Sequence, residues 1–176
     1  MLLFLAQGAA FAATGVKAQP VFKIQRVYLK QLALEQPNSP AIFLESDAPK
    51  VEVKVDIGSS RLNSSKLESG VYETWIDITV TLKVKGKIAL LLKGRQAGIF
   101  DIQNVPADQI SSLLGVGCTN IVYPYLRANL ADAITRAGFP PVHLAEVNWE
   151  DFYKKDQLKK TGSIPFPVKV DENSRP

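Results

Sequence analysis

The stretch VYETWIDITVTLKV, Val71–Val84, decides the fold because apolar and polar residues alternate along most of it. Successive side chains of a β-strand point to opposite faces of the sheet, so the alternation separates an inward set from an outward set. The inward set is Ile76, Ile78, Val80, Leu82 and Val84, and the outward set is Asp77, Thr79, Thr81 and Lys83. A strand of this kind is typical of an antiparallel sheet with one buried face and one face in water.

The segments on either side extend this sheet. VEVKVDI (Val51–Ile57) alternates strictly between apolar and charged residues. Gly86 allows a turn into KIALLLKG (Lys87–Gly94), and VFKIQRVYLKQLAL (Val21–Leu34) predicts a first strand. Between the first and second strands lies EQPNSPAIFLESDAPK (Glu35–Lys50), whose Pro, Asn, Ser and Asp residues are typical of loops. This connection is long enough to cross over the sheet instead of forming a hairpin.

Beyond Phe100 the apolar residues repeat at helical spacing. Pro106 suits the first position of a helix, and Asp108 places a negative charge in its first turn. Gly138, followed by a proline pair, ends this long helix. Pro124 lies inside the helix and removes one helical hydrogen bond, which predicts a bend in the axis.

A second, shorter helix is expected from Asn148, a favourable N-cap residue, through WEDFYKK (Trp149–Lys155). The sequence thus predicts an α+β domain: a four-stranded antiparallel sheet with a long crossover loop, packed with one long kinked helix and one short C-terminal helix. This domain is expected to span residues 21–158. The tail, 159–176, contains several prolines and no apolar period, so it is expected to be disordered.

The leader, residues 1–20, contains a short apolar run, Leu2–Ala13, that resembles the core of a secretion signal. Ala10-Phe11-Ala12 resembles a cleavage site, but no cation precedes the run, because the first one is Lys17. A disordered leader and a misassigned start codon are the alternatives. If Leu2–Ala12 is a true signal, the protein is expected outside the cytoplasm.

Composition argues against several classes of function. The 176 residues carry a net charge of +4 from basic residues that are scattered along the chain, so nucleic acid is not an expected partner. No apolar run reaches the roughly 20 residues of a membrane helix, so no stable membrane insertion is expected. A single cysteine excludes an intrachain disulfide.

Candidate catalytic and metal-binding residues are scarce. The one histidine, His143, lies between apolar residues, and Cys118 has no second cysteine for a metal or redox site. Glu150 and Asp151 suit the charged first turn of the second helix better than an acid–base pair. No catalytic residue, cofactor or metal is expected, and the sequence favours a binding protein. A small-molecule carrier or enzyme that uses Cys118 and His143 is the alternative.

Four blocks of the sequence resemble SecB, the bacterial protein-export chaperone family. CTNIVYPYLR (Cys118–Arg127) resembles the family segment Cys-Pro-Asn-Ile-Leu-Phe-Pro-Tyr-Ala-Arg, with Thr119 in place of the proline. Three further blocks agree in the same order, and the likeness covers roughly Phe22 to Tyr153. These blocks are FKIQRVYLKQLALEQPNSPAIF (Phe22–Phe43), QAGIF (Gln96–Phe100) and GFPPVHLAEVNW (Gly138–Trp149).

The resemblance implies a cytoplasmic homotetramer, a dimer of dimers, that binds unfolded secretory precursors in apolar grooves and delivers them to the SecA motor. The groove candidates are Ile42, Phe43 and Leu44 on the crossover loop, Trp149, Phe152 and Tyr153 on the second helix, and Val51, Val53 and Val55 as the floor. The alternative is that these residues simply pack the loop and helix onto the sheet. In the family the long helix helps to assemble the oligomer, which implies packed surroundings for Cys118, Tyr123, Tyr125 and Leu126.

The resemblance implies docking to SecA less fully than it implies client binding. Family members present an acidic patch on the open face of the sheet, and here Glu35 and Leu91 fit that patch. Gln31 and Lys93 stand where acids are usual. Lys93 reverses a charge, which would weaken attraction to a basic partner surface. A SecB-like chaperone that serves other clients without SecA docking is therefore the alternative function.

Overall fold

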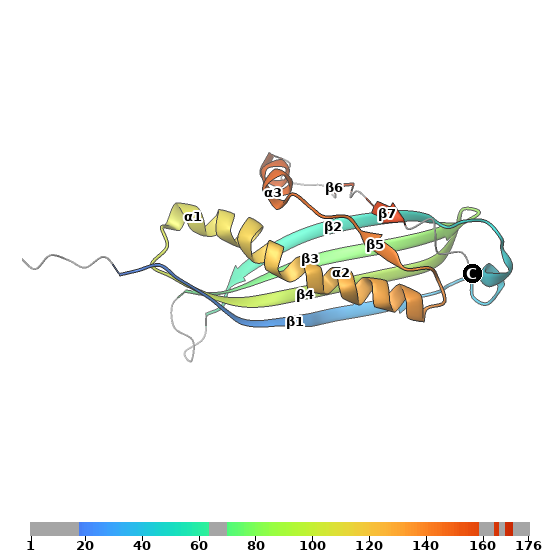
Figure 1. The fold of residues 1–176 in the computed structure, drawn as a ribbon, viewed down its shortest axis with the longest axis horizontal. Helices are drawn as coiled ribbons and strands as arrows, with labels where there is room; N and C mark the ends of the chain where they lie inside the picture. The colour runs from blue at the N-terminus through green and yellow to red at the C-terminus, as the bar shows by residue number, and fades with distance from the viewer. Residues whose placement is uncertain (1–17, 64–69, 159–163, 166–167, 171–176) are drawn as a thin grey trace, which may run out of the picture.

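The structure is a computed structural model that describes residues 18–63, 70–158, 164–165 and 168–170. Its main feature is an antiparallel sheet built on four long strands, as the sequence predicted (Figure 1). Their spatial order is β1-β4-β3-β2, so the connection from the first strand to the second crosses over the sheet. The strands are β1 (Val21–Glu35), β2 (Lys50–Arg61), β3 (Val71–Val84) and β4 (Lys87–Gln103).

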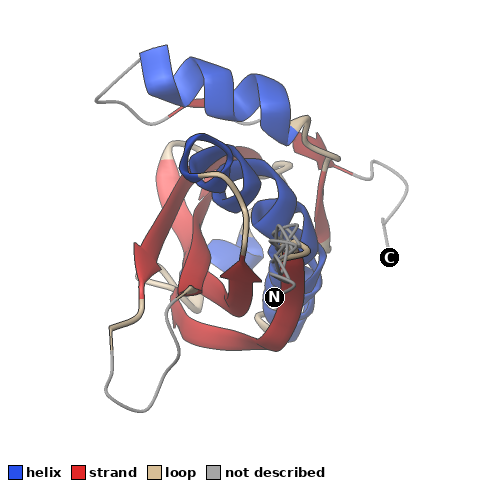
Figure 2. Cartoon of the chain, turned by 90° about the vertical axis from the view of Figure 1, so that its left-hand side faces the viewer, coloured by secondary structure: helices blue, strands red, loops and turns tan. Residues whose placement is uncertain are grey.

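A long helical segment covers one face of this sheet and leaves the other face open (Figures 1 and 2). Three elements follow one another without a break: α1 (Ala107–Ser112), the π-helix η2 (Leu113–Cys118) and α2 (Thr119–Arg136). The short helix α3 (Trp149–Leu158) packs on η2. The α+β architecture predicted from the sequence is therefore confirmed.

Burial follows the alternation in β3. The side chains from Ile76 to Val84 that were predicted to point inward are all buried, and Ile78 is almost completely so. The side chains of Asp77 and Thr79, which point to the open face, are partly exposed. One face of the sheet therefore belongs to the core, and the other faces water.

Two glycines of β4 let the helical layer approach closely. A Cβ atom at Gly94 would lie only 2.9 Å from the side chains of Leu126 and Leu130 on α2. A Cβ atom at Gly98 would lie 3.0 Å from Val122, one turn earlier on the same helix. Small residues here allow α2 to fit directly against the strand.

The helix ends lie where the sequence predicted them. Pro106 immediately precedes α1, and Gly138 has a φ of +87° beyond the end of α2. At the start of α3, the Asn148 side-chain oxygen accepts hydrogen bonds from the backbone N–H groups of Glu150 and Asp151, at 3.1 and 3.2 Å. These bonds satisfy N–H groups that a helix cannot pair internally.

Several short elements were not predicted. The crossover contains the 3-10 helix η1 (Ala41–Leu44), and η2 is a π-helix inside what the sequence presents as one long helix. β5 (Val142–Leu144) pairs with β7 (Val168–Val170), and β6 (Ile164–Pro165) pairs with β2. β6 and β7 lie inside the tail range for which disorder was expected.

The signal-like run Leu2–Ala13 lies outside the residues that the structure describes. Within the described ranges, no helix combines the length and apolar character needed to cross a membrane.

The inward and outward positions of β3 predict very different costs of truncation. Ile78→Ala removes a buried side chain and should lower the free energy of unfolding by about 3 kcal/mol. Thr79→Ala, one residue further along on the open face, should cost less than about 1 kcal/mol. Urea unfolding followed by circular dichroism measures both. Equal losses in the two variants would contradict the assignment of faces.

Candidate functional site

The predicted groove residues of the crossover loop differ sharply in exposure. Ile42 is buried, whereas the side chains of Phe43 and Leu44 are 48% and 89% exposed. The Phe43 ring lies 5.2 Å from that of Phe139, just beyond α2. Gln36 donates a hydrogen bond of 3.0 Å to the carbonyl oxygen of Ala137, which also ties the loop to this end of the helix.

The predicted floor lies on β2. Val53 and Val55 are buried in the core, and Val51 is partly buried. Their side chains are therefore covered by the protein itself. They alternate with charged residues that face the open side, as the sequence predicted.

The predicted groove residues of α3 form an aromatic cluster with α2. Trp149 is only 2% exposed, and its ring makes edge contacts with those of Tyr123 and Phe152 at centroid distances of 5.2 and 5.4 Å. The Tyr123 hydroxyl donates a hydrogen bond of 2.5 Å to the Ala145 carbonyl oxygen. Tyr153 is partly buried. These contacts hold α3 against the long helix.

The three groups of candidates are arranged along β2 and do not form one patch. The crossover loop leads into the start of β2, the valines follow on the strand, and α3 lies toward the other end (Figure 1). A cavity of about 270 Å³ lies at that second end, where β2 meets η2 and α3. Its lining is Ile57, Gly58, Ser59, Thr74, Ser111, Leu114, Gly115, Thr119 and Tyr153.

Most residues of this cavity were missed in the sequence. The available signal was Gly58, because a glycine inside a strand often marks a close approach of another group. The group that approaches Gly58 is the Trp75 ring on the open face, since a Cβ atom at Gly58 would lie 2.4 Å from it, so this signal did not point to the cavity. Tyr153 similarly lies over Gly115, where a Cβ atom would be 2.3 Å from the ring.

The edge strand β1 carries a second apolar surface that sequence reasoning missed. Large apolar side chains are exposed along its whole length, on both faces of the strand. Alternation did not point to them, because apolar residues occupy successive positions in VFKI and LAL. The exposed residues are Val21, Phe22, Ile24, Leu29, Leu32 and Leu34.

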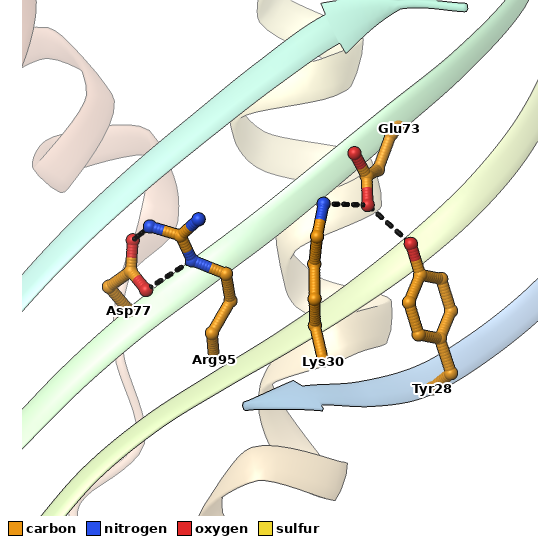
Figure 3. Close-up of polar contacts among 5 residues, drawn as sticks. All are labelled: Tyr28, Lys30, Glu73, Asp77 and Arg95. Carbon is orange, nitrogen blue, oxygen red and sulfur yellow. Dashed lines mark hydrogen bonds and ion pairs between the residues drawn. The ribbon is translucent and has the colours of Figure 1, made fainter. Parts of the chain in front are cut away.

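On the open face, Glu73 lies at the centre of a polar network that crosses three strands (Figure 3). The Tyr28 hydroxyl donates a hydrogen bond to the Glu73 carboxylate, and Lys30 makes an ion pair with the same oxygen at 2.7 Å. Burial alone would raise the pKa of Glu73, but the hydrogen bonds from Lys30 and Tyr28 outweigh it and lower that pKa. Burial, together with the bond to Glu73, raises the pKa of Tyr28 to about 12.

A second ion pair lies beside this network. Arg95 donates two hydrogen bonds to the Asp77 carboxylate, at 2.6 and 2.7 Å (Figure 3). The hydrogen bond to Asp77 raises the pKa of Arg95. Lys30 and Arg95 each lie 5.7 Å from the centre of the Trp75 ring. Both carboxylates are therefore paired with cations of the same face.

The residues predicted to dock SecA are neighbours on this open face. Glu35 of β1 is the direct cross-strand partner of Leu91 on β4. Lys93, the next open-face position of β4, is exposed and lines a small cavity together with Gln31. The structure therefore brings all four residues to one region.

Of the four residues predicted for oligomer contacts, three are buried inside the protomer. Cys118, Tyr123 and Leu126 belong to its core, and Tyr125 is 54% exposed. Burial raises the pKa of the Cys118 thiol to about 12, so the sulfur stays protonated at neutral pH. His143 lies on β5 with an exposed side chain. Among the described residues, no group of three His, Cys, Asp or Glu could hold a metal ion.

The Glu73 network predicts a pH dependence of stability. Because the folded pKa of Glu73 lies below the ordinary value of 4.5, its carboxylate stabilises the fold above that pH. The contribution is lost as the pH falls through the folded pKa. The difference in unfolding free energy between the wild type and Glu73→Gln should therefore shrink in acid, which urea titrations between pH 7 and about pH 3 measure. A constant difference would contradict the ionised network.

Comparisons with known proteins agree with these features. A profile of the SecB family, described as preprotein translocase subunit SecB, matches residues 15–160. Protein-export protein SecB of Janthinobacterium sp. (strain Marseille) is 61% identical over 137 residues, which cover 78% of this chain and 80% of the relative. The corresponding protein of Burkholderia vietnamiensis is 57% identical over 140 residues, covering 80% and 85%.

Among solved structures, a SecB-like chaperone of Mycobacterium tuberculosis in complex with an antitoxin peptide has a TM-score of 0.58 to this chain. The two are 13% identical, and the match covers 72% of this chain and 91% of that one, so the likeness shows the fold. The profile match takes in the four long strands and the helices from η1 to α3, and the identity of the bacterial relatives extends over most of the chain. The protein therefore belongs to the SecB family of protein-export chaperones.

Proposed function

We propose that this SecB-family chaperone is a cytoplasmic homotetramer that holds unfolded secretory precursors on apolar surfaces and delivers them to SecA. The observation that carries the client-binding part is the exposure of Phe43 and Leu44 where the crossover loop leads into the valine row of β2. Adjacent exposed apolar side chains of this size favour an interaction site over a solvated loop.

Client binding at this site requires only burial of apolar surface. Each Å² removed from water contributes about 25 cal/mol, offset by the ordering of the client chain. Single contacts are therefore weak and tolerant of client sequence. Several sites on one oligomer bind tightly together, because the second contact forms at a high effective concentration.

The two ends of β2 differ in accessibility. Phe43 and Leu44 can contact a client directly, whereas Trp149 and Phe152 are buried between α3 and α2. The aromatic cluster can contribute to client binding only if α3 lifts away. First contact at the crossover loop, followed by entry toward α3, fits this difference.

Assembly into a tetramer is supported by the exposed apolar side chains of β1 and by Tyr125. β1 is an edge strand among the strands that the structure describes, and an edge strand offers backbone groups for pairing with another strand. Tyr125 is exposed on the long helix. These are the surfaces on which we expect contacts between protomers.

A second candidate function is a SecB-family chaperone that does not dock SecA. It is favoured by the charges of the open face, where Lys30 and Arg95 neutralise Glu73 and Asp77, and where Lys93 is exposed. Glu35 and Asp56 still contribute negative charge to this face, but Lys93 lies in the same small cavity as Asp56 and reduces the attraction to a basic partner surface. Binding to SecA separates the two functions.

The client site predicts the effect of one double variant. Phe43→Ser with Leu44→Ser should weaken binding of an unfolded precursor by about tenfold or more, because each side chain contributes up to about 1.5–3 kcal/mol when buried. Calorimetry gives the affinity, and light scattering shows whether the protein still slows aggregation of the precursor.

Ser46→Asn, an exposed change on the same loop, is the matched control and should behave like the wild type. Unchanged client affinity in the double variant would remove the crossover loop from the site. A wild-type protein that slows the aggregation of no precursor would overturn the proposed function itself.

The charges of the docking face predict that reversing the charge of Lys93 increases the affinity for SecA. Lys93→Glu should strengthen binding to SecA, because it restores negative charge beside Glu35 and Leu91. Lys23→Glu, an exposed change near the other end of β1, is the control for net charge. Surface plasmon resonance at two salt concentrations measures both variants. Equal SecA affinity in the wild type and Lys93→Glu would show that this face does not set docking.

A further inference from the structure

The C-terminal part of the chain returns to the sheet and pairs with the edge strand β2. In β6, Pro165 faces Lys54 and Ile164 faces Val55, in antiparallel register. A few residues later, β7 pairs with β5 and also lies close to β2 (Figure 1). We call β6 and β7 together the strap.

The strap lies in the middle of the proposed client site. Its partners on β2 follow Val51 and Val53, and the cavity between β2 and α3 begins at Ile57, two residues beyond Val55. The crossover loop with Phe43 and Leu44 precedes the same strand. A client chain that ran along β2 from the loop to the cavity would meet the strap.

The pairing of the strap with β2 is short. β2 has 12 residues, and β6 pairs with two of them. An unfolded client brings a long run of unpaired backbone groups, so it can form a longer ladder with the same edge. A longer ladder gains more hydrogen bonds and buries more side chains on alternate positions.

We propose that the free edge of β2 binds extended client segments by strand addition, and that the strap occupies this edge as an internal competitor until a client displaces it. The inference rests on the proposed client-binding function and deepens it. The sequence of the strap supports this role, because Ile164, Val168 and Val170 are the β-branched residues favoured in strands.

Tethering explains how so short a strap can compete. β6 follows soon after the end of α3 at Leu158, so its local concentration at β2 is of the order of millimolar. A client must therefore exceed a threshold of length and apolar character before it displaces the strap. Folded proteins, which have few free backbone groups, fall below that threshold.

A disulfide that locks the strap in place tests the proposal. Facing residues of antiparallel strands have Cα atoms about 4.5–5.5 Å apart, a distance that a disulfide can bridge. The full-length variant Lys54→Cys with Pro165→Cys should therefore crosslink with oxidised glutathione. The native Cys118 is buried and does not compete. Lys54→Cys alone, treated identically, is the control.

The crosslinked protein should bind an unfolded precursor several-fold more weakly than its reduced form, and dithiothreitol should restore the affinity. Failure of the crosslink to form would overturn the inference, because the register would not be populated. A crosslink that leaves client affinity unchanged would also overturn it. If the untreated wild type binds no client at all, the proposed function fails as well, so the two failures are distinct.

Loosening the strap should have the opposite effect. Ile164→Gly, Val168→Gly and Val170→Gly together remove the strand-favouring residues from the full-length chain. A strap that is closed in roughly 70–90% of molecules lowers apparent affinity by about 3- to 10-fold, and this variant should recover that factor. The matched control places three glycines further along the tail: Glu172→Gly, Asn173→Gly and Ser174→Gly. Equal client affinity in the two variants would overturn the inference.

Discussion

The contact between one face of the sheet and the long helix is the constraint on which the rest of the molecule depends. The inward side chains of β3 are buried together in this contact. Gly94 and Gly98 of β4 have no side chains, so Leu126, Leu130 and Val122 of α2 fit directly against the strand. Since this core uses only one face, the opposite face and the two edges of the sheet contribute polar contacts such as the Glu73 network but little of the apolar core. The protein can therefore vary the charges of the open face and the residues of its edges without rebuilding the core.

Strands and helix ends could be predicted from the sequence because each has a local signal. Alternation marks β3, and Gly138 and Asn148 mark the end of α2 and the start of α3. The π-helix η2 has no such signal, because its packing involves Gly115 against Tyr153, from a distant part of the chain. The strands β5 and β7 have three residues each, too few for a period, and pair across a long separation in sequence.

In the candidate site too, some features follow from the local sequence and others follow only from tertiary packing. The sequence showed that the crossover loop carries apolar residues. It did not show that Ile42 is buried while Phe43 and Leu44 are exposed, because tertiary packing decides their exposure. Judged from the alternation alone, Glu73 occupies an ordinary outward position of β3. Its burial follows from Tyr28 and Lys30, which reach it from β1 across β4 (Figure 3). The order of the strands in the sheet therefore decides which carboxylates of this face are neutralised. The sequence of a single strand does not reveal it.

The unequal edges of the sheet also bear on solubility. A sheet with two open, apolar edges could in principle add copies of itself at both ends and grow into a fibre, since heterologous contacts of this kind do not close. Among the described strands, none pairs with the outer side of the apolar β1 edge, whereas the β2 edge is shorter, carries charges on its open side and is partly paired with β6. β6 occupies two positions of the β2 edge, and the charges along the open side of β2 disfavour apolar contact there, so growth through both edges of the sheet is less favourable than growth through two open apolar edges. The tail residues of β6 would then help to limit self-association in a protein that keeps other chains from aggregating.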